Sequence, residues 1–445
     1  MSKVALVFPY FRTKAPTEML FAPLGVASLT AQLRRLGIET SIFDCTFKTF
    51  EQIKDDIIAF HPEILGIYSM ITLSRNTFRL AEMVRTYLPE CLLVVGGPMP
   101  TLYPKRYSQQ FDAVFRGEAD LSFPLFCQDY FGQKIARSSL QRMPLQSFAG
   151  LFTNNQGILI DNPCIHHTEA EIETFPLPDR SDFDHAAYQK EWLQKTGSKT
   201  TSVMTTLGCP FNCDFCSKPV FGNLFRRRNL DTVFAEIESI LHLGYDSLWI
   251  ADDNFTLSLS YLKSFCQRMS GRQIKWACLS RSTGINQEIA VLMKEAGCKR
   301  VYLGLESGSQ ATLKLMNKKA TLEDGLNAVY HFKKAGIEVA AFFIVGYPGE
   351  TEIAFEETFN YALSLILDDI SFNVPFPLPG SKLFERVSDV DEEKDWDKEN
   401  EVTFVYQTEF DQAWLKLRID QTLLTFEENK PHHDVSLPSN YPDKF

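Results

Sequence analysis

The chain has 445 residues, enough for two or three domains, and its 44% hydrophobic and 23% charged residues are typical of a folded globular protein. Its formal net charge of -11 at pH 7 disfavours non-specific binding to nucleic acid, because phosphate backbones would be repelled. No stretch reaches the roughly 18 consecutive apolar residues of a transmembrane helix, and the apolar run Val4–Tyr10 is too short for a signal peptide, so we expect a cytoplasmic protein without a transmembrane segment.

Residues 1–135 alternate short apolar segments with amphipathic ones. Between the first two apolar segments, hydrophobic residues recur at helical spacing from Val26 to Leu36, which predicts a helix. Such alternation indicates an α/β fold with a doubly wound parallel sheet that carries helices on both faces. Parallel sheets of this kind bind ligands at the C-terminal ends of their strands, where Ser69, Gly96 and Gly97 would lie. The predicted strands are Val4–Phe8, Glu39–Asp44, Ile64–Ser69, Leu92–Gly96 and Ala113–Arg116.

Residues 136–198 have no regular hydrophobic period. The turn residues Asn154–Gly157 predict a β-hairpin, and Pro176 and Pro178 interrupt helix and strand patterns. We therefore expect a linker with a hairpin between two domains.

A second alternating series occupies residues 199–375, and Gly244, Gly297 and Gly336 each follow a predicted helix, as helix-ending glycines do. Six strand–helix units predict a partial (β/α)6 barrel, in which chemistry gathers at the C-terminal ends of the strands. Residues 376–445 are expected to form a short C-terminal extension. The predicted strands are Ser202–Thr206, Ser247–Ala251, Lys275–Ser280, Arg300–Gly304, Glu338–Val345 and Asp369–Val374. The predicted helices are Leu230–Leu243, Tyr261–Met269, Asn286–Ala296, Thr321–Ala335 and Glu350–Leu367.

Three of the ten cysteines are clustered, as Cys209, Cys213 and Cys216 in a C-x3-C-x2-C spacing directly after the first predicted barrel strand. Three thiolates on one loop can hold three irons of a four-iron cube and leave the fourth iron open to another ligand. A structural zinc site is the alternative, but it requires a fourth protein ligand, and the next histidine, His242, is far along the chain. The other seven cysteines are expected to be buried thiols, and the basic run Arg226–Arg228 is interpreted as a solvated loop.

The run Cys209-x3-Cys213-x-Phe215-Cys216 resembles the signature of the radical S-adenosylmethionine (SAM) superfamily, including the aromatic residue before the last cysteine. The resemblance implies a 4Fe–4S cluster held by the three cysteines, with SAM chelating the open iron. One electron from the reduced cluster would cleave SAM to methionine and a 5′-deoxyadenosyl radical, which removes a hydrogen atom from an unactivated carbon.

Further residues at successive predicted strand ends resemble the SAM contacts of this superfamily. Asp252 and Asp253, which the sequence does not separate, stand where the family contacts the SAM amino group. Arg281 would be within reach of a carboxylate or the substrate. The resemblance assigns Glu306 to the ribose and Gly346 to the loop beside the adenine.

The first 135 residues resemble the cobalamin-binding domain of one large radical SAM subclass. The matching segments are Pro23–Gly25, Gly66–Ser69, Val94–Pro98 and Arg116–Asp120, so Ser69, Gly96, Gly97 and Glu118 are the expected cobalamin contacts. The chain lacks the Asp-x-His-x-x-Gly pattern that supplies a histidine below cobalt in other cobalamin enzymes. Leu73 and Arg75 are candidates for that lower face by position alone.

The resemblance implies a cobalamin-dependent methyltransferase that acts on a small molecule and takes its electron from a donor such as a flavodoxin or ferredoxin. A cyclase or oxidoreductase of the same architecture is the alternative, and a non-catalytic binding protein is a third reading. The phenylalanines near the cysteines suit an apolar substrate such as a lipid or tetrapyrrole, although packing in the core explains them as well.

Overall fold

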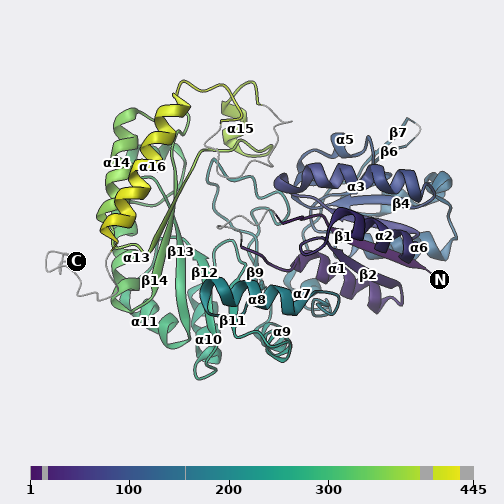
Figure 1. Cartoon of the computed structure of the whole chain (residues 1–445), viewed down its shortest axis with the longest axis horizontal. Coiled ribbons are helices and arrows are strands. Elements are labelled where there is room, and N and C mark those ends of the chain that lie inside the picture. The colour runs from purple at the N-terminus through teal and green to yellow at the C-terminus, as the bar shows by residue number, and fades with distance from the viewer. Residues whose placement is uncertain (1, 13–18, 156, 391–403, 431–445) are drawn as a thin grey trace.

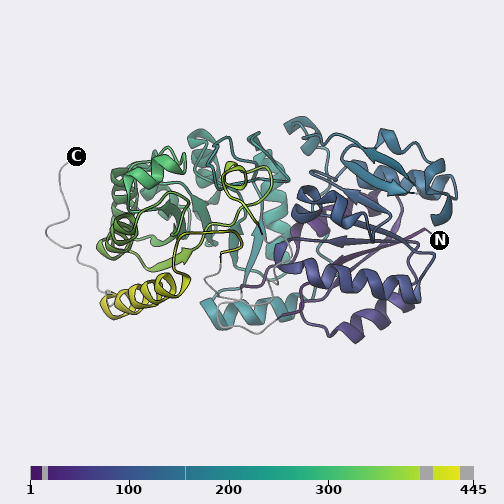
Figure 2. The ribbon, with the colours of Figure 1, turned by 90° about the horizontal axis from the view of Figure 1, so that it is seen from above.

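The computed structural model describes residues 2–12, 19–155, 157–390 and 404–430. Two α/β lobes lie side by side, the N-terminal lobe in purple and blue and the second lobe in teal and green (Figures 1 and 2). Each lobe is built around its own parallel sheet.

The sheet of the N-terminal lobe has five parallel strands in the order β2-β1-β3-β4-β5. Its central strands are almost wholly buried, because helices cover both faces and a separate apolar core forms on each side. Helix α2 begins with a reciprocal cap, in which Thr49 and Gln52 each accept the other's backbone N–H. The predicted doubly wound sheet is confirmed. The strands are β1 (Lys3–Phe8), β2 (Glu39–Asp44), β3 (Ile64–Tyr68), β4 (Leu92–Gly96) and β5 (Ala113–Phe115). The helices are α1 (Leu24–Arg35), α2 (Phe50–Phe60), η1 (Ile71–Leu73), α3 (Ser74–Tyr87), α4 (Pro98–Leu102), α5 (Pro104–Tyr107) and α6 (Ser122–Gly132).

The segment predicted as a linker contains the expected hairpin, and that hairpin belongs to the first sheet. Strand β6 pairs antiparallel with β5, and β7 follows it, which extends the sheet to seven strands. Helix α8 then contacts the N-terminal lobe, where Tyr188 donates to Asp44 at 2.7 Å and Trp192 Nε1 to Leu20 O at 2.6 Å. The domain boundaries given above stay a prediction. The elements are η2 (Arg137–Arg142), η3 (Leu145–Ser147), β6 (Leu151–Asn155), β7 (Ile158–Asp161), α7 (Glu169–Ile172) and α8 (His185–Thr196).

The second lobe is an open six-stranded parallel sheet in the order β15-β14-β13-β12-β11-β8, as a partial barrel requires. Its core includes the buried Trp276, whose Nε1 donates to Ala296 O at 2.8 Å. A short helix that the sequence did not predict, α12, follows the fourth strand. The strands are β8 (Thr200–Val203), β11 (Ser247–Ile250), β12 (Lys275–Ser280), β13 (Cys298–Glu306), β14 (Glu338–Ile344) and β15 (Asp369–Asn373). The helices are α9 (Leu230–His242), α10 (Leu259–Met269), α11 (Gln287–Glu295), α12 (Gln310–Leu315), α13 (Leu322–Lys334) and α14 (Glu352–Ser364).

The C-terminal extension packs against the second lobe. Helix α16 (Gln412–Asn429) lies beside α14, away from the N-terminal lobe (Figure 1), and Arg418 Nε donates to Glu356 Oε1 at 2.9 Å. A short helix, α15 (Lys382–Arg386), precedes it. Residues 391–403 and 431–445 of the extension lie outside the described part of the chain.

The interpretation of Arg226–Arg228 as a solvated loop is wrong for two of the three residues. These lie on and just after β10 (Arg226–Arg227), which pairs with β9 (Thr206–Leu207). Arg226 is buried against Glu118, and Arg228 Nη1 donates to Glu236 Oε2 at 2.7 Å. Acidic partners distant in sequence neutralise these charges, which a local charge pattern does not reveal.

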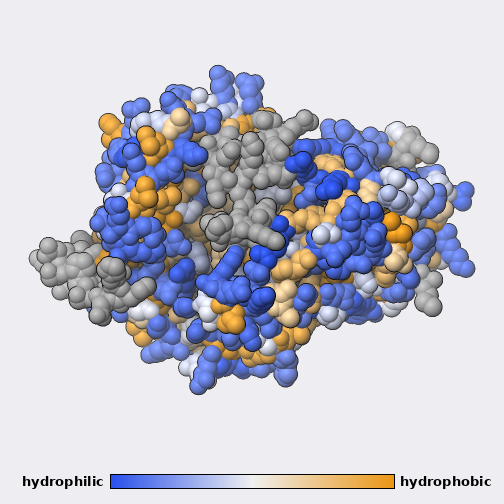
Figure 3. Space-filling view, in the orientation of Figure 1, coloured by the Kyte–Doolittle hydropathy of each residue, from blue (hydrophilic) through white to orange (hydrophobic). Residues whose placement is uncertain are grey.

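The face of the molecule in Figure 3 is mostly hydrophilic, with hydrophobic residues in small scattered groups. No helix in the described part of the chain has the length and apolar character needed to cross a bilayer. Six of the seven scattered cysteines are buried as expected, and Cys164 is exposed.

Candidate functional site

The three clustered cysteines lie on a loop closed at its base by a two-stranded hairpin. Strands β9 and β10 pair antiparallel, so the loop leaves the barrel and returns to it at the same point. Lys218 Nζ donates to Cys209 O at 2.7 Å and so ties the far part of the loop to its start. Cys213 is buried, Cys209 is half-buried and Cys216 is exposed.

The donor set on this loop fits an iron–sulfur cluster. The guanidinium of Arg281 donates from Nη1 to Cys213 Sγ at 3.3 Å and lies 3.9 Å from the ring centre of Phe211. Arg281 is itself buried, so its positive charge lies directly against the sulfur of Cys213. No three His, Cys, Asp or Glu side chains among the described residues are arranged to hold a single metal ion. A four-iron cube instead binds each thiolate through a different iron.

Although Cys216 is exposed as a residue, desolvation of its sulfur raises the pKa of the thiol in the metal-free chain to about 11. Iron must therefore displace its proton when it binds, since thiolates and not thiols are the ligands.

The two aspartates after β11 have different surroundings. Asp252 is buried and accepts hydrogen bonds from Thr205 N and Oγ1, both at 2.6 Å, and from Thr206 Oγ1 at 2.8 Å. Burial nevertheless raises the pKa of Asp252 to about 6. Asp253 is exposed, and its charge acts on the thiols of Cys209 and Cys216, raising their pKa. Asp252 thus fixes the strand that leads into the cysteine loop, whereas Asp253 faces the loop itself.

Glu306, at the end of β13, forms a buried ion pair that the sequence did not suggest. Lys318 Nζ donates to Glu306 Oε1 at 2.5 Å, and the two side chains are 5% and 9% exposed. Arg281 also donates to the backbone oxygen of Lys318, so the three residues form one chain of contacts that ends at Cys213. A Cβ at Gly304 would lie 2.5 Å from Glu306 Oε1, which leaves no room for a larger residue there. No local pattern marks Lys318, because it follows α12 in a loop.

The loop after β14 is held by Glu350 and covered by the C-terminal extension. Gly346 N and Tyr347 N donate to Glu350 Oε2 at 2.9 and 3.0 Å. Tyr406 donates its hydroxyl to Gly346 O at 3.3 Å, and a Cβ at Gly346 would lie 2.5 Å from the ring of Phe404. The extension therefore shapes the loop predicted to adjoin the adenine.

We expect Glu350→Gln to change how stability depends on pH. Burial raises the pKa of Glu350 from 4.5 to about 7. Because the unfolded chain loses this proton first, folding becomes less favourable as the pH rises from about 4.5 to about 7, by at most about 3 kcal/mol. The glutamine does not titrate and still accepts both backbone N–H groups. We would measure the free energy of unfolding by urea denaturation at pH 5 and pH 8. The difference between the variant and wild type should shift in favour of the variant at pH 8.

Glu352→Gln, an exposed change two residues along the same segment, is the control for this titration. Parallel pH profiles for wild type and the Glu350 variant would contradict the assignment.

The C-terminal extension also reaches the cysteine loop itself. Arg386 Nη2 donates to Asp214 Oδ2 at 2.6 Å, and Leu383 N donates to Asp214 O at 2.9 Å. Asp214 is buried although it lies between two of the cysteines. Asp214 was not among the residues predicted from the sequence, and its counter-charge, Arg386, comes from the C-terminal extension.

The predicted residues of the N-terminal lobe gather at the C-terminal ends of its parallel strands. We call this end of the sheet, with Gly96 and Gly97, the glycine edge. Ser69 N donates to Gly96 O at 2.8 Å, so the ends of β3 and β4 adjoin. The Ser69 hydroxyl is buried against Tyr107 OH at 2.8 Å. Leu73 is only 2% exposed. At this edge the backbone around Gly96 and Gly97, more than these two side chains, is available to a ligand.

Glu118, the last predicted residue of this edge, is engaged across the two lobes. Arg226 Nη1 lies 2.7 and 2.8 Å from its two carboxylate oxygens. His166 Nδ1 lies 2.8 Å from Oε1, and His167 N donates to Oε2 at 3.1 Å. A direct contact of Glu118 with cobalamin stays a prediction.

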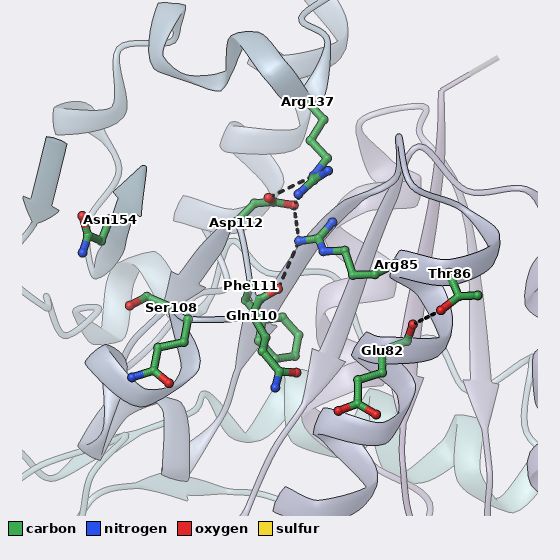
Figure 4. Close-up of a pocket in the computed structure, with 10 residues that line it drawn as sticks. Glu82, Arg85, Thr86, Ser108, Gln110, Phe111, Asp112, Arg137 and Asn154 are labelled. Carbon is green, nitrogen blue, oxygen red and sulfur yellow. Dashed lines mark hydrogen bonds and ion pairs between the residues drawn. The ribbon is translucent and has the colours of Figure 1, made fainter. Parts of the chain in front are cut away.

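A polar pocket of about 540 Å³ lies near the N-terminal ends of the strands of the N-terminal sheet (Figure 4). Its guanidinium groups are already paired, since Arg85 and Arg137 both donate to Asp112, at 2.9 Å and 3.0 Å. Asp112 precedes β5, so this pocket is at the opposite ends of the strands from Gly96 and Gly97 and is separate from the candidate site.

Comparison with known proteins agrees with the two-lobed arrangement. Residues 203–362 match the family model of the radical SAM superfamily, and residues 14–126 match that of the B12 binding domain. An uncharacterized methyltransferase of Pyrococcus horikoshii is 30% identical over 401 residues, which are 86% of this chain and 82% of that protein.

A second relative has a different reaction in its name. The anaerobic magnesium-protoporphyrin IX monomethyl ester cyclase of Rubrivivax gelatinosus is 26% identical over 428 residues, 92% of this chain and 74% of the cyclase. Among solved structures, the radical SAM methyltransferase TsrM from Kitasatospora setae, with cobalamin and a 4Fe–4S cluster bound, has a TM-score of 0.73 at 18% identity. The alignment covers 87% of this chain and 78% of TsrM, and it shows that the fold is shared.

Proposed function

The chain belongs to the cobalamin-binding branch of the radical SAM superfamily, and we propose that it methylates an unactivated carbon of a small molecule. The observation that carries the proposal is the pairing of two sites in one chain: three clustered cysteines on the barrel, with no fourth protein ligand beside them among the described residues, and the glycine-bearing strand ends of the N-terminal sheet. When bound, SAM and the reduced cluster supply a 5′-deoxyadenosyl radical, and cobalamin supplies a carrier for the methyl group.

Cys209, Cys213 and Cys216 would hold the cluster. Asp253 is the better candidate for the SAM ammonium, because its carboxylate is exposed beside the cysteine loop while Asp252 is committed to Thr205 and Thr206. This choice separates two residues that the sequence left equivalent.

The remaining SAM contacts would come from three strand ends. Arg281 combines a buried positive charge with a contact to Cys213, which suits a carboxylate chelated at the same cluster. Glu306 would bind the ribose while Lys318 holds its carboxylate in place. Gly346 would lie beside the adenine, on the loop that Glu350 fixes.

Cobalamin would lie on the edge formed by Ser69, Gly96 and Gly97, with Leu73 and Glu118 as further predicted contacts. Glycine at position 97 lets the ends of β3 and β4 pack closely, which gives this edge the backbone shape proposed to receive the ligand. The contact between Glu118, just after β5, and Arg226, at the base of the cysteine loop, supports placing the two cofactors at neighbouring sites.

The substrate is proposed to be a small and largely apolar molecule. Four phenylalanines around the cysteine loop are each half-buried, which leaves ring surface for an apolar ligand. They are Phe211, Phe215, Phe221 and Phe225. We also propose that the protein acts in the cytoplasm, with a flavodoxin or ferredoxin as its electron donor.

The alternative function is cyclisation or oxidation without methyl transfer, which the similarity to the Rubrivivax gelatinosus cyclase favours. The two are distinguished by the products formed from SAM. Protein reconstituted anaerobically with iron, sulfide and cobalamin should release both S-adenosylhomocysteine and 5′-deoxyadenosine when reductant is added. Release of 5′-deoxyadenosine alone would favour the cyclase or oxidoreductase.

A further inference from the structure

A buried ion pair joins the cysteine loop to the N-terminal lobe. The side chains of Glu118 and Arg226 are 1% and 7% exposed, and one guanidinium nitrogen lies within 2.8 Å of both carboxylate oxygens. Arg226 Nη1 also donates to His167 O at 2.9 Å, and Nη2 donates to Phe221 O at 3.2 Å. Together with His166 and the backbone N–H of His167, these contacts occupy both oxygens of the carboxylate.

The position of this pair relates it to both predicted cofactor sites. Glu118 closely follows β5, whose Phe115 pairs in register with Gly96 at the glycine edge. Arg226 lies on β10 opposite Leu207, two residues before Cys209. The ion pair therefore connects the segment after β5, at the predicted cobalamin site, directly to β10, at the base of the cysteine loop.

Close backbone packing beside the pair limits movement of the loop. A Cβ at Gly208 would lie 2.1 Å from Leu224 O, and one at Gly222 would lie 2.8 Å from His166 Nε2. A Cβ at Gly117 would lie 3.3 Å from the Cβ of Cys164. The part of the cysteine loop that leads back to β10 therefore packs against Gly208, at the start of the loop, and against His166, in the segment that follows the first sheet.

We propose that Glu118 and Arg226 are positioning residues that set the separation and orientation of the SAM–cluster site relative to the cobalamin site. The inference rests on the proposed function, since it requires a reaction that uses both sites. Neither charge can be left alone in a buried position at low cost, so the two lobes keep the geometry that satisfies the pair. Because Arg226 also donates to the backbone oxygens of His167 and Phe221, the direction of its guanidinium is fixed as well as its distance from Glu118.

The consequence is a selective defect when the pair is broken. Reductive cleavage of SAM uses groups of the barrel alone, so formation of 5′-deoxyadenosine should persist. Transfer of the SAM methyl group to cobalamin, which releases S-adenosylhomocysteine, requires both sites in register. A displacement of about 1 Å is enough to slow such a step about 100-fold.

The experiment compares Arg226→Gln and Arg226→Lys with wild type, each reconstituted with iron, sulfide and cobalamin. We expect unchanged iron and cobalamin content, a 5′-deoxyadenosine rate within about twofold of wild type, and a rate of S-adenosylhomocysteine release lower by about tenfold or more. The relaxation rate of cob(II)alamin in electron paramagnetic resonance should also respond less to reduction of the cluster, because that effect depends on the distance between the two centres.

The matched control is Asp368→Asn, which breaks a largely buried pair with Lys333 inside the second lobe, just before β15. It should reduce thermal stability without changing the ratio of the two products. If Arg226→Gln does not fold, Arg226→Lys retains the charge and tests the loss of the combined guanidinium contacts to Glu118, His167 O and Phe221 O.

Equal changes in both products, or an unaltered relaxation effect in variants with full cofactor content, would overturn the inference. Failure of the wild type to release S-adenosylhomocysteine would instead contradict the proposed methyl transfer. The relaxation measurement would still test the positioning role in that case.

Discussion

Replacing Cys213 by alanine is expected to abolish reductive cleavage of SAM, with 5′-deoxyadenosine formation falling by about 1,000-fold or more, as for the loss of an essential catalytic group. The loop offers three thiols, and the structure brings no other cysteine or histidine among the described residues into a three-ligand metal site with them. Two thiolates cannot hold the cube with one open iron, and Arg281 would keep its buried charge without the sulfur beside it.

The measurement is iron content per chain together with 5′-deoxyadenosine after anaerobic reconstitution and reduction. Cys164→Ala is the control, because Cys164 is an exposed free cysteine outside the loop and its loss should leave both quantities unchanged. Full iron content and turnover in the Cys213 variant would remove the basis for assigning this loop to the cluster.

Replacing Gly97 by alanine is expected to cost roughly 2–5 kcal/mol of stability and to remove most cobalamin binding. Gly97 has φ 110° and ψ −172°, a conformation that is essentially restricted to glycine. An added Cβ would lie 2.6 Å from Ser69 O and 3.0 Å from the Tyr68 ring. The backbone must therefore shift at the junction of β3 and β4, where the ligand edge is formed.

The test is cobalamin retained per chain after gel filtration, with the unfolding midpoint measured on the same samples. Gly132→Ala is the matched control, because Gly132 ends helix α6, has no atom near the added Cβ and is far along that helix from the edge. Stability equal to wild type in the Gly97 variant would show that this backbone can relax without cost.

The strands and most helices followed from the sequence because their signals are local. Five apolar segments in the N-terminal lobe and six in the second lobe became strands with ends within two residues of those predicted, except that β8 ends at Val203 and not at Thr206. The cysteine spacing was sufficient to locate the loop, since ligands for one cluster lie close together in the chain. These features depend on residues a few positions apart.

The partners of the charged residues required the tertiary structure. Glu118 and Arg226 are 108 positions apart, and Asp214 and Arg386 are 172 apart, so no local pattern links either pair. The same limit explains why Arg226 was interpreted as solvated.

The sequence by itself therefore determined the class of chemistry, through Cys209, Cys213 and Cys216, and the two sheets that carry it. The tertiary structure alone decided which side chains remain available: it separated Asp252 from Asp253, and it committed Glu118 to a pair between the lobes. The physical reason is that the cluster ligands lie a few residues apart in the sequence, whereas burial and charge neutralisation arise only when distant segments pack together.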